Sequence, residues 1–126
     1  MQPVLLVALG GALGSVLRYL TGVLAARWLG VELPWGTLIV NLVGSFLIGL
    51  VNELALDALT LSPEARLFLA AGVMGGLTTY SALSYETARL MEAQAWTTAC
   101  IYVAVTTAAC VGLCFGGIAA ARYIAR

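Results

Sequence analysis

The sequence contains no histidine and no lysine, and only 10% of its 126 residues are charged. Without histidine there is no imidazole to act as a general base or to bind a metal. Six arginines balance six acidic residues, and no basic run long enough to attract nucleic acid is present. No nucleotide motif, redox-cofactor motif or nucleophile–base pair is found either. We therefore expect a protein that is not an enzyme.

What the chain has in excess is apolar surface: 62% of its residues are hydrophobic and the mean hydropathy is +1.01. Soluble domains carry about 25% charged residues, so lipid must solvate most of this surface. A spanning helix needs about 20 mainly apolar residues. Four segments satisfy this requirement, which predicts a single all-α, four-helix transmembrane domain over residues 1–126, with both termini on the same side: 3–26, 33–52, 67–85 and 95–121.

The arginines give almost no preference for one orientation in the membrane. One side is expected to hold Arg66, Arg122 and Arg126, and the other Arg27 and Arg89. Because positively charged residues select the cytoplasmic side, three against two is nearly no bias. Two interpretations stay open. The chain inserts either way up, which permits an antiparallel dimer, or the arginines after the last span place both termini in the cytoplasm.

Small residues recur at one-turn spacing in the first and last spans. Gly10 and Gly14 form one pair, and Gly112 and Gly116 form another. Such pairs let helix backbones approach closely, although glycine is also frequent in membrane helices. A single chain of 13.1 kDa encloses little by itself, and closed two-fold dimers are the commonest oligomers. We therefore expect a dimer.

The three cysteines all fall in the last span. Cys110 and Cys114 lie one turn apart, and Cys100 lies further towards the start of the same segment. Cysteines buried in an apolar helix usually act as small hydrophobic residues. We therefore expect neither a disulfide nor a metal site from this pair.

Two polar residues interrupt the first two spans. Arg18 lies about two-thirds of the way through the first span, where it either marks a pathway or extends to the interface. Asn41 lies in an uncharged helix, where an unpaired amide is costly. It either ties two helices together or belongs to a polar stripe with Thr37, Gly44 and Ser45.

The third span contains the clearest signal. Gly72, Gly75 and Gly76 are followed by Thr78 and Thr79, and this combination makes a poor helix in mid-membrane. The pattern predicts either a broken helix or a kinked one. A break frees backbone carbonyls, which membrane proteins tolerate only where the carbonyls face protein, water or an ion.

Hydroxyl groups follow this interruption and recur in the last span. Ser81 and Ser84 come after the predicted break, while Tyr102, Thr106 and Cys110 are spaced four residues apart. If the two groups face each other, they form a track of hydrogen-bond donors. Several close donors can replace the water of a small anion. The residues therefore favour passive permeation or transport of a small solute, with an anion preferred.

Three segments resemble the Fluc (CrcB) family of fluoride channels: Gly10–Tyr19 (GGALGSVLRY), Gly36–Asn41 (GTLIVN) and Gly75–Ser81 (GGLTTYS). The resemblance extends over essentially the whole chain, and the order and spacing of the three motifs are highly specific. It implies a multi-pass protein of the bacterial inner membrane, assembled as a dual-topology antiparallel dimer with two pores that relieve cytoplasmic fluoride toxicity.

The resemblance also implies a structural Na⁺ at the dimer interface, held by the backbone carbonyls of Gly75 and Thr78. It places Arg18 and Glu86 in the vestibule. The pore-lining residues implied by the family are Asn41, Tyr80, Ser81, Leu83, Ser84, Tyr102 and Cys110.

The chain departs from the family pattern after the third motif. The family usually continues Thr-Phe-Ser-Thr-Phe, with the edges of both phenylalanine rings along the fluoride path. Here Tyr80 replaces the first phenylalanine, Ala82 the second threonine and Leu83 the second phenylalanine. An aliphatic side chain has no positively polarised ring edge. A homodimer is expected, and a heterodimer with a more typical paralogue is the alternative.

Two other functions are alternatives to a fluoride channel. A proton-coupled exporter of small cations, similar to the small multidrug resistance proteins, needs a carboxylate within the first span, where this chain has Arg18 and no acid. A non-conducting subunit of a membrane assembly, or of a heterodimeric channel, is the other alternative, and Leu83 is the residue that favours it.

Overall fold

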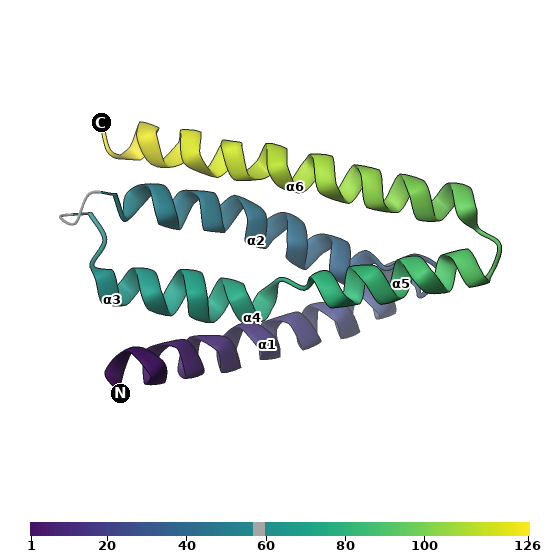
Figure 1. The fold of residues 1–126 in the computed structure, drawn as a ribbon, viewed down its shortest axis with the longest axis horizontal. Helices are drawn as coiled ribbons and strands as arrows, with labels where there is room; N and C mark the ends of the chain where they lie inside the picture. Colours follow the sequence, from purple (N-terminus) through teal and green to yellow (C-terminus); the bar gives the residue numbers. More distant parts are fainter. Residues whose placement is uncertain (57–59) are drawn as a thin grey trace.

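The computed structural model describes residues 1–56 and 60–126, and every regular element in these ranges is helical. Figure 1 shows the helices running roughly alongside one another, with both chain termini at the same end. The elements in chain order are α1 (Gln2–Leu29), α2 (Trp35–Leu54), α3 (Pro63–Arg66), the π-helix η1 (Leu67–Met74), α4 (Gly75–Leu77), α5 (Tyr80–Glu92) and α6 (Trp96–Ile124).

Four helical stretches are long and apolar enough to cross a membrane: Gln2–Leu29, Trp35–Leu54, Pro63–Glu92 and Trp96–Ile124. The third is longer than the predicted 67–85 because polar residues extend it at both ends. Ser62 caps its start, where the Ser62 hydroxyl accepts a hydrogen bond from the Ala65 amide at 3.2 Å. Part of the predicted joint before this span, residues 57–59, lies outside the described residues.

Glycines bring α1 against the third span. A methyl group on Gly10 would lie 2.9 Å from the Cα of Gly72, and one on Gly14 would overlap the Val73 carbonyl. A methyl group on Gly76 would lie 2.5 Å from the Gly11 carbonyl. The helix backbones therefore touch directly, as the pair Gly10 and Gly14 predicted.

The glycine contacts of α6 differ from those that the sequence indicated. A methyl group on Gly112 would have no neighbour within 4 Å among the described residues, and one on Gly116 would meet only the Phe46 ring, at 3.8 Å. Gly117 instead packs on the Phe46 carbonyl, and Gly49 of α2 packs on the Cys114 carbonyl. Within the chain the close contact of α6 is therefore made by Gly117 and not by the pair Gly112 and Gly116, because helix rotation points Gly117 at α2.

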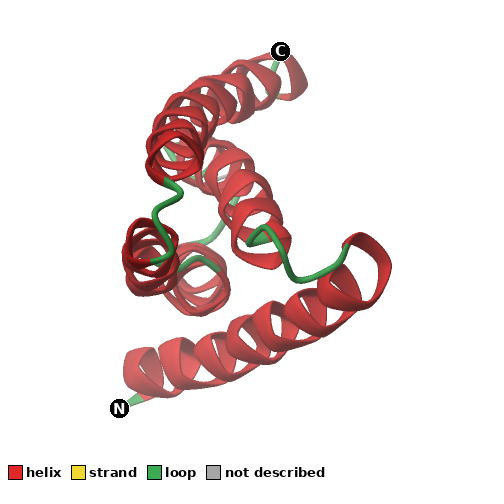
Figure 2. Cartoon of the chain, turned by 90° about the vertical axis from the view of Figure 1, so that its right-hand side faces the viewer, coloured by secondary structure: helices red, strands yellow, loops and turns green. Residues whose placement is uncertain are grey.

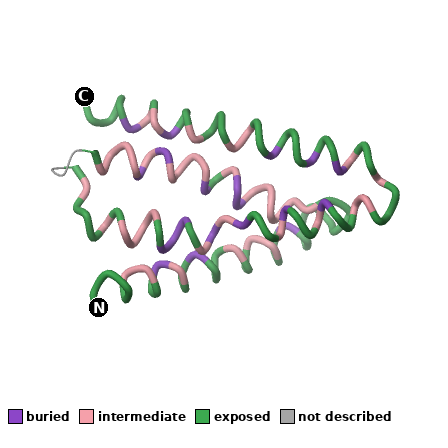
Figure 3. The backbone as a smooth tube through the Cα atoms, in the orientation of Figure 1, coloured by how far each residue is buried: buried purple, intermediate pink, exposed green. Residues whose placement is uncertain are grey.

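The core is small. Val40, Val73, Met74 and Leu77 form the buried apolar cluster, and Val40 is the only large side chain of the described residues that is fully buried. Seen end-on (Figure 2), α1 lies at one edge of the bundle and α6 at the other, with α2 and the third span between them. The outer faces of α1 and α6 are largely exposed (Figure 3), as expected for helices whose solvent is lipid.

Candidate functional site

The third span is interrupted in its middle by two residues with extended backbone. Thr78 has φ −81° and ψ 153°, and Thr79 has φ −152° and ψ 118°, so α4 ends before them and α5 begins after them. Both threonine hydroxyls are occupied locally. Thr78 Oγ1 donates to the Met74 carbonyl at 2.8 Å, and Thr79 Oγ1 accepts from the Ala82 amide at 3.2 Å, which caps α5.

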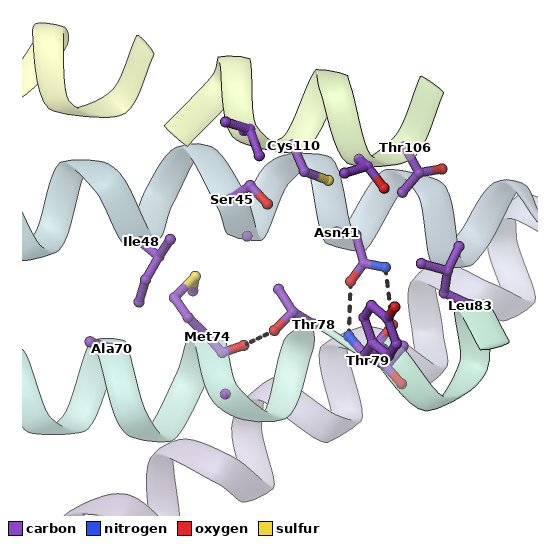
Figure 4. A pocket seen from close by; sticks show the side chains of 15 residues that line it. Asn41, Ser45, Ile48, Ala70, Met74, Thr78, Thr79, Leu83, Thr106 and Cys110 are labelled. Atoms are coloured by element: carbon purple, nitrogen blue, oxygen red, sulfur yellow. Dashed lines mark hydrogen bonds between the residues drawn. The ribbon is translucent and has the colours of Figure 1, made fainter. Parts of the chain in front are cut away.

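Asn41 supports this interruption from the neighbouring helix α2. Its Nδ2 donates to the Thr79 carbonyl at 3.1 Å, and the Thr79 amide donates to its Oδ1 at 2.8 Å (Figure 4). Asn41 is 9% exposed, so both hydrogen bonds are sheltered. The side chain thus replaces, for one residue, the backbone partners that the interrupted helix cannot supply. The structure thus shows that Asn41 ties α2 to the third span, and the interpretation as part of a polar stripe stays open.

The hydrogen bond from the Thr79 amide to Asn41 also affects the Gly75 carbonyl. In a continuous α-helix the Thr79 amide would donate to the Gly75 carbonyl, four residues earlier. Here that amide is directed to Asn41. Gly75 is exposed and a methyl group there would meet nothing closer than the Ala70 carbonyl at 3.9 Å, so its surroundings within the described chain are open. The interruption therefore takes from the Gly75 carbonyl the amide donor that a continuous helix would give it, at a residue that is itself exposed.

A groove of about 430 Å³ lies over the interruption, between α2, the third span and α6. It is lined mainly by apolar surface, with Met74 and Leu83 on the side of the third span and Cys110 on α6. Polar groups reach it from all three sides (Figure 4): Asn41, Ser45, Thr78, Thr79, Tyr80, Thr106 and Thr107. The groove thus brings four of the predicted pore-lining residues together: Asn41, Tyr80, Leu83 and Cys110.

Thr106 carries the one buried side-chain polar atom that lacks a hydrogen-bond partner among the described residues. The residue is only 2% exposed, and its hydroxyl does not bond to the preceding turn of α6. Leaving such a hydroxyl unpaired costs about 1–3 kcal/mol. The α6 wall of the groove therefore contains a buried hydroxyl that is without a hydrogen-bond partner among the described residues.

Glu86 forms a second polar cluster, beyond the groove, that joins three helices. Thr37 Oγ1 of α2 donates to Glu86 Oε1 at 2.7 Å, and the Tyr102 hydroxyl of α6 donates to Glu86 Oε2 at 2.9 Å. Tyr102 was predicted beside Thr106 and Cys110 in a pore. In the structure Tyr102 is not among the residues that line the groove, and its hydroxyl bonds to Glu86. Thr37 is a member of this cluster that sequence reasoning did not pair with Glu86.

The remaining predicted site residues lie around these two clusters. Ser81 Oγ lies 3.1 Å from Thr79 Oγ1, and Ser84 Oγ donates to the Tyr80 carbonyl at 3.0 Å, so both serines bond within their own segment. Neither lines the groove. Arg18 is half-buried on α1 and belongs to neither of the ion pairs found among the described residues.

Comparison with known proteins places this arrangement in a family. The sequence profile described as "CrcB-like protein, Camphor Resistance (CrcB)" matches residues 5–118. Proteins named fluoride-specific ion channel FluC are similar over most of the chain. One such protein from Thermus thermophilus is 61% identical over 92 residues, 73% of each chain. That from Agrobacterium fabrum is 48% identical over 117 residues, 93% of this chain and 94% of the relative.

A third relative, from Anaeromyxobacter dehalogenans, is 46% identical over 125 residues, 99% of each chain. The match thus runs through all four spans and includes Asn41, the interruption at Thr78 and Thr79, and Glu86. This confirms the resemblance carried by the three sequence motifs, and the chain belongs to the CrcB family.

Proposed function

We propose that this protein is a passive, fluoride-selective ion channel of the bacterial inner membrane, which lets fluoride leave the cytoplasm and so limits its toxicity. The observation that carries the proposal is the groove over Thr78 and Thr79, which Asn41 and Thr106 line from α2 and α6, in a chain whose relatives are named fluoride channels. Conduction through a groove needs no bond-making chemistry.

Donors in the groove suit a small, strongly hydrated anion. Such an ion gives up water only where several close donors replace it. The Asn41 amide has two N–H groups, of which one is bonded to the Thr79 carbonyl, so the other remains to bind the ion. The Thr106 hydroxyl has no partner among the described residues, and in the proposal it turns from its buried position toward the ion. Fluoride then passes beside Tyr80, Leu83 and Cys110, with Ser81, Ser84 and Tyr102 in the continuing polar path.

Charges at the entrance complete the proposed pathway. Arg18 is half-buried and free of an ion pair among the described residues, so its charge attracts anions to the vestibule. Glu86 has the opposite charge, yet both of its oxygens accept hydrogen bonds from Thr37 and Tyr102. These bonds hold the Glu86 carboxylate in place. In this proposal its negative charge interacts with the Thr37 and Tyr102 hydroxyls rather than with the ion in the pathway.

A second copy of the chain would close the groove. Tyr80 starts α5 in the middle of the third span, lines the groove and is 81% exposed. Lipid cannot hydrogen-bond a hydroxyl at that depth, whereas a second chain can cover it. We propose that this second chain is an identical copy, so that one sequence supplies the groove lining on both sides of the dimer.

The tryptophans support an antiparallel arrangement of the two copies. Trp28, Trp35 and Trp96 lie at the ends of α1, α2 and α6 that face away from the termini (Figure 1). Tryptophans anchor membrane proteins at both membrane interfaces. A single orientation would leave one interface without tryptophan, while an antiparallel pair places three at each. This adds to the nearly balanced arginines.

The carbonyls at the interruption fit a structural Na⁺ between the two copies. The Thr79 amide, which a continuous helix would direct to the Gly75 carbonyl, bonds to Asn41, and Thr78 has left helical geometry, so in the proposal both carbonyls turn to a cation. Hard cations prefer oxygen ligands, and unwound carbonyls bind Na⁺ in membrane proteins. In the proposal each chain supplies Gly75 and Thr78, and the ion links the two interruptions by charge.

Removing Na⁺ is expected to stop conduction and loosen the dimer, because carbonyls facing one another without a cation repel. Proteoliposomes loaded with fluoride are dialysed into N-methylglucamine buffer, and efflux is followed with a fluoride electrode. Readdition of Na⁺ should restore efflux, whereas readdition of N-methylglucamine should not. Undiminished efflux after prolonged dialysis, with Na⁺ verified as absent from the protein, contradicts the Na⁺ proposal.

The proposed function is tested by fluoride efflux from proteoliposomes that contain this chain alone. Fluoride is expected to leave down its gradient, with chloride flux far slower. Equal fluoride and chloride flux would rule out the selective channel, and proton flux driven by small cations would indicate the exporter. No flux from this chain alone, but flux with a typical paralogue added, would replace the homodimer with a heterodimer.

A further inference from the structure

A second hollow, of about 410 Å³, lies at the C-terminal end of α6, far along the helix from the groove (Figure 1). It shares no lining residue with the groove. Its lining comes from α6 and the chain end just after it, at spacings of three and four residues that follow one helix face: Phe115, Ile118, Ala119, Arg122, Tyr123 and Arg126. We call it the basic hollow.

The basic hollow faces away from the rest of the chain. Gly117 is the residue at which this part of α6 packs on α2. Successive residues of a helix are turned by about 100°, so Phe115 and Ala119, each two residues from Gly117, point about 160° away from that contact. Phe115 and Tyr123 are both largely exposed. Because α6 is long and apolar enough to span a membrane, lipid is the solvent on this face.

The length of α6 places the two ends of the basic hollow at different depths. The helix has 29 residues, or about 43 Å at a rise of about 1.5 Å per residue. A bilayer is about 40–45 Å thick with its headgroups and about 30 Å thick without them. The last turn, with Arg122, therefore lies among the headgroups. Phe115, two turns earlier, lies beside the acyl chains.

Two guanidinium groups at the headgroup end supply donors for a phosphate. Arg122 is oriented by Glu53 of α2, whose Oε1 accepts a hydrogen bond from Arg122 Nε at 2.7 Å. This bond uses one of the five N–H groups of the guanidinium, and the Arg122 side chain is largely exposed. Arg126 belongs to neither of the ion pairs found among the described residues. Arginine suits phosphate because its planar donors bind two oxygens at once.

From this arrangement we propose that the basic hollow binds an anionic phospholipid. The lipid phosphate contacts the guanidinium groups of Arg122 and Arg126, and the Tyr123 ring lies at the level of the headgroup, where aromatic residues are enriched. One acyl chain lies over Phe115 and Ile118. Basic residues at a membrane surface favour lipids with a net negative charge over zwitterionic ones. This binding is independent of which ion the protein conducts.

Native mass spectrometry of the purified protein, with lipid added in detergent, measures the binding. Phosphatidylglycerol, which is anionic, is compared with zwitterionic phosphatidylcholine of the same acyl chains. Arg122→Gln/Arg126→Gln should retain about 25-fold less phosphatidylglycerol than the unmodified chain, because each arginine at a membrane surface contributes about a fivefold preference. Its retention of phosphatidylcholine should change little. Phe115→Ala should weaken the retention of both lipids, because it removes the contact with the acyl chain.

Two control variants separate lipid binding from other effects of the arginines. Glu53→Gln breaks the ion pair with Arg122 and keeps both arginines of the basic hollow, so it should retain at least as much phosphatidylglycerol as the unmodified chain. Arg89→Gln removes an exposed arginine, paired with Glu92, at the opposite end of the bundle (Figure 1). It should leave the retention of phosphatidylglycerol unchanged.

Several results would overturn the proposal. Unchanged phosphatidylglycerol retention in Arg122→Gln/Arg126→Gln would show that the arginines do not bind the lipid. An equal loss in Glu53→Gln would mean that the ion pair between helices, and not a contact with lipid, is responsible. Displacement of the lipid by inorganic phosphate, with no effect of Phe115→Ala, would indicate a site for a free anion. A changed oligomeric mass with unchanged lipid retention would indicate that this face contacts a second copy of the chain.

Discussion

Replacing Asn41 with alanine is expected to abolish fluoride efflux, the largest functional effect of any single substitution in this chain. The change removes the amide donor that faces the groove and both hydrogen bonds to Thr79. The Thr79 amide and carbonyl are then left buried without partners, each at a cost of about 1–3 kcal/mol. The interruption should therefore rearrange, and efflux from proteoliposomes should fall to the level of empty vesicles.

Asn52→Ala is the matched control for this prediction. Asn52 lies on the same helix, near its end, and its Oδ1 accepts a hydrogen bond from Arg66 Nε at 3.0 Å in an exposed setting. Exposed polar pairs contribute about 0–1 kcal/mol, so Asn52→Ala should conduct normally. Asn41→Ala that elutes as an intact dimer and conducts at the original rate would show that Asn41 is not part of the pathway.

Gly117→Ala is expected to cause the largest loss of stability. A methyl group at Gly117 would overlap the Phe46 carbonyl and lie 2.8 Å from the Leu50 amide nitrogen. Both neighbours are backbone atoms of α2, so relief requires α2 and α6 to separate. Overpacking of this kind typically costs about 1–3 kcal/mol. We expect a clear drop in the thermal denaturation midpoint of the purified protein in detergent.

Gly112→Ala provides the comparison on the same helix. No atom of the described chain lies within 4 Å of the added methyl group, and replacing a helical glycine by alanine gains about 1 kcal/mol in helix propensity. The Gly112→Ala protein should therefore denature at or above the original temperature. Equal destabilisation by both substitutions would mean that the close approach at Gly117 does not govern the packing of α2 on α6.

Which residues meet across the bundle could be predicted only in part. Gly10 and Gly14 were recognisable because glycines one turn apart let helix backbones approach closely, although the pattern is not specific. On α6 Gly117 was missed. Adjacent residues point about 100° apart around a helix, and the sequence does not mark which of them faces α2. The cost of leaving the Asn41 amide unpaired could be predicted. Its partner could not, because Thr79 lies on another span.

The hydrogen bonds of the polar site could likewise be predicted only in part. Ser81 and Ser84 were predicted to line the pore, but their local hydrogen bonds could not be predicted, because nearby backbone and hydroxyl groups compete for short side chains. Glu86 was expected at the vestibule from the family resemblance. Its pairing with Thr37 and Tyr102 depends on three helices converging, which no local pattern encodes.

Hydropathy and motif spacing were enough to predict four membrane spans and membership of the CrcB family, because both are local properties of the chain that can be recognised without any partner. Which polar groups are satisfied became visible only in the folded chain. Packing paired Asn41 with Thr79, directed the Thr79 amide away from the Gly75 carbonyl and left the Thr106 hydroxyl without a partner among the described residues. These outcomes escape the sequence because hydrogen bonds between helices depend on interhelical distances, and packing alone sets those distances.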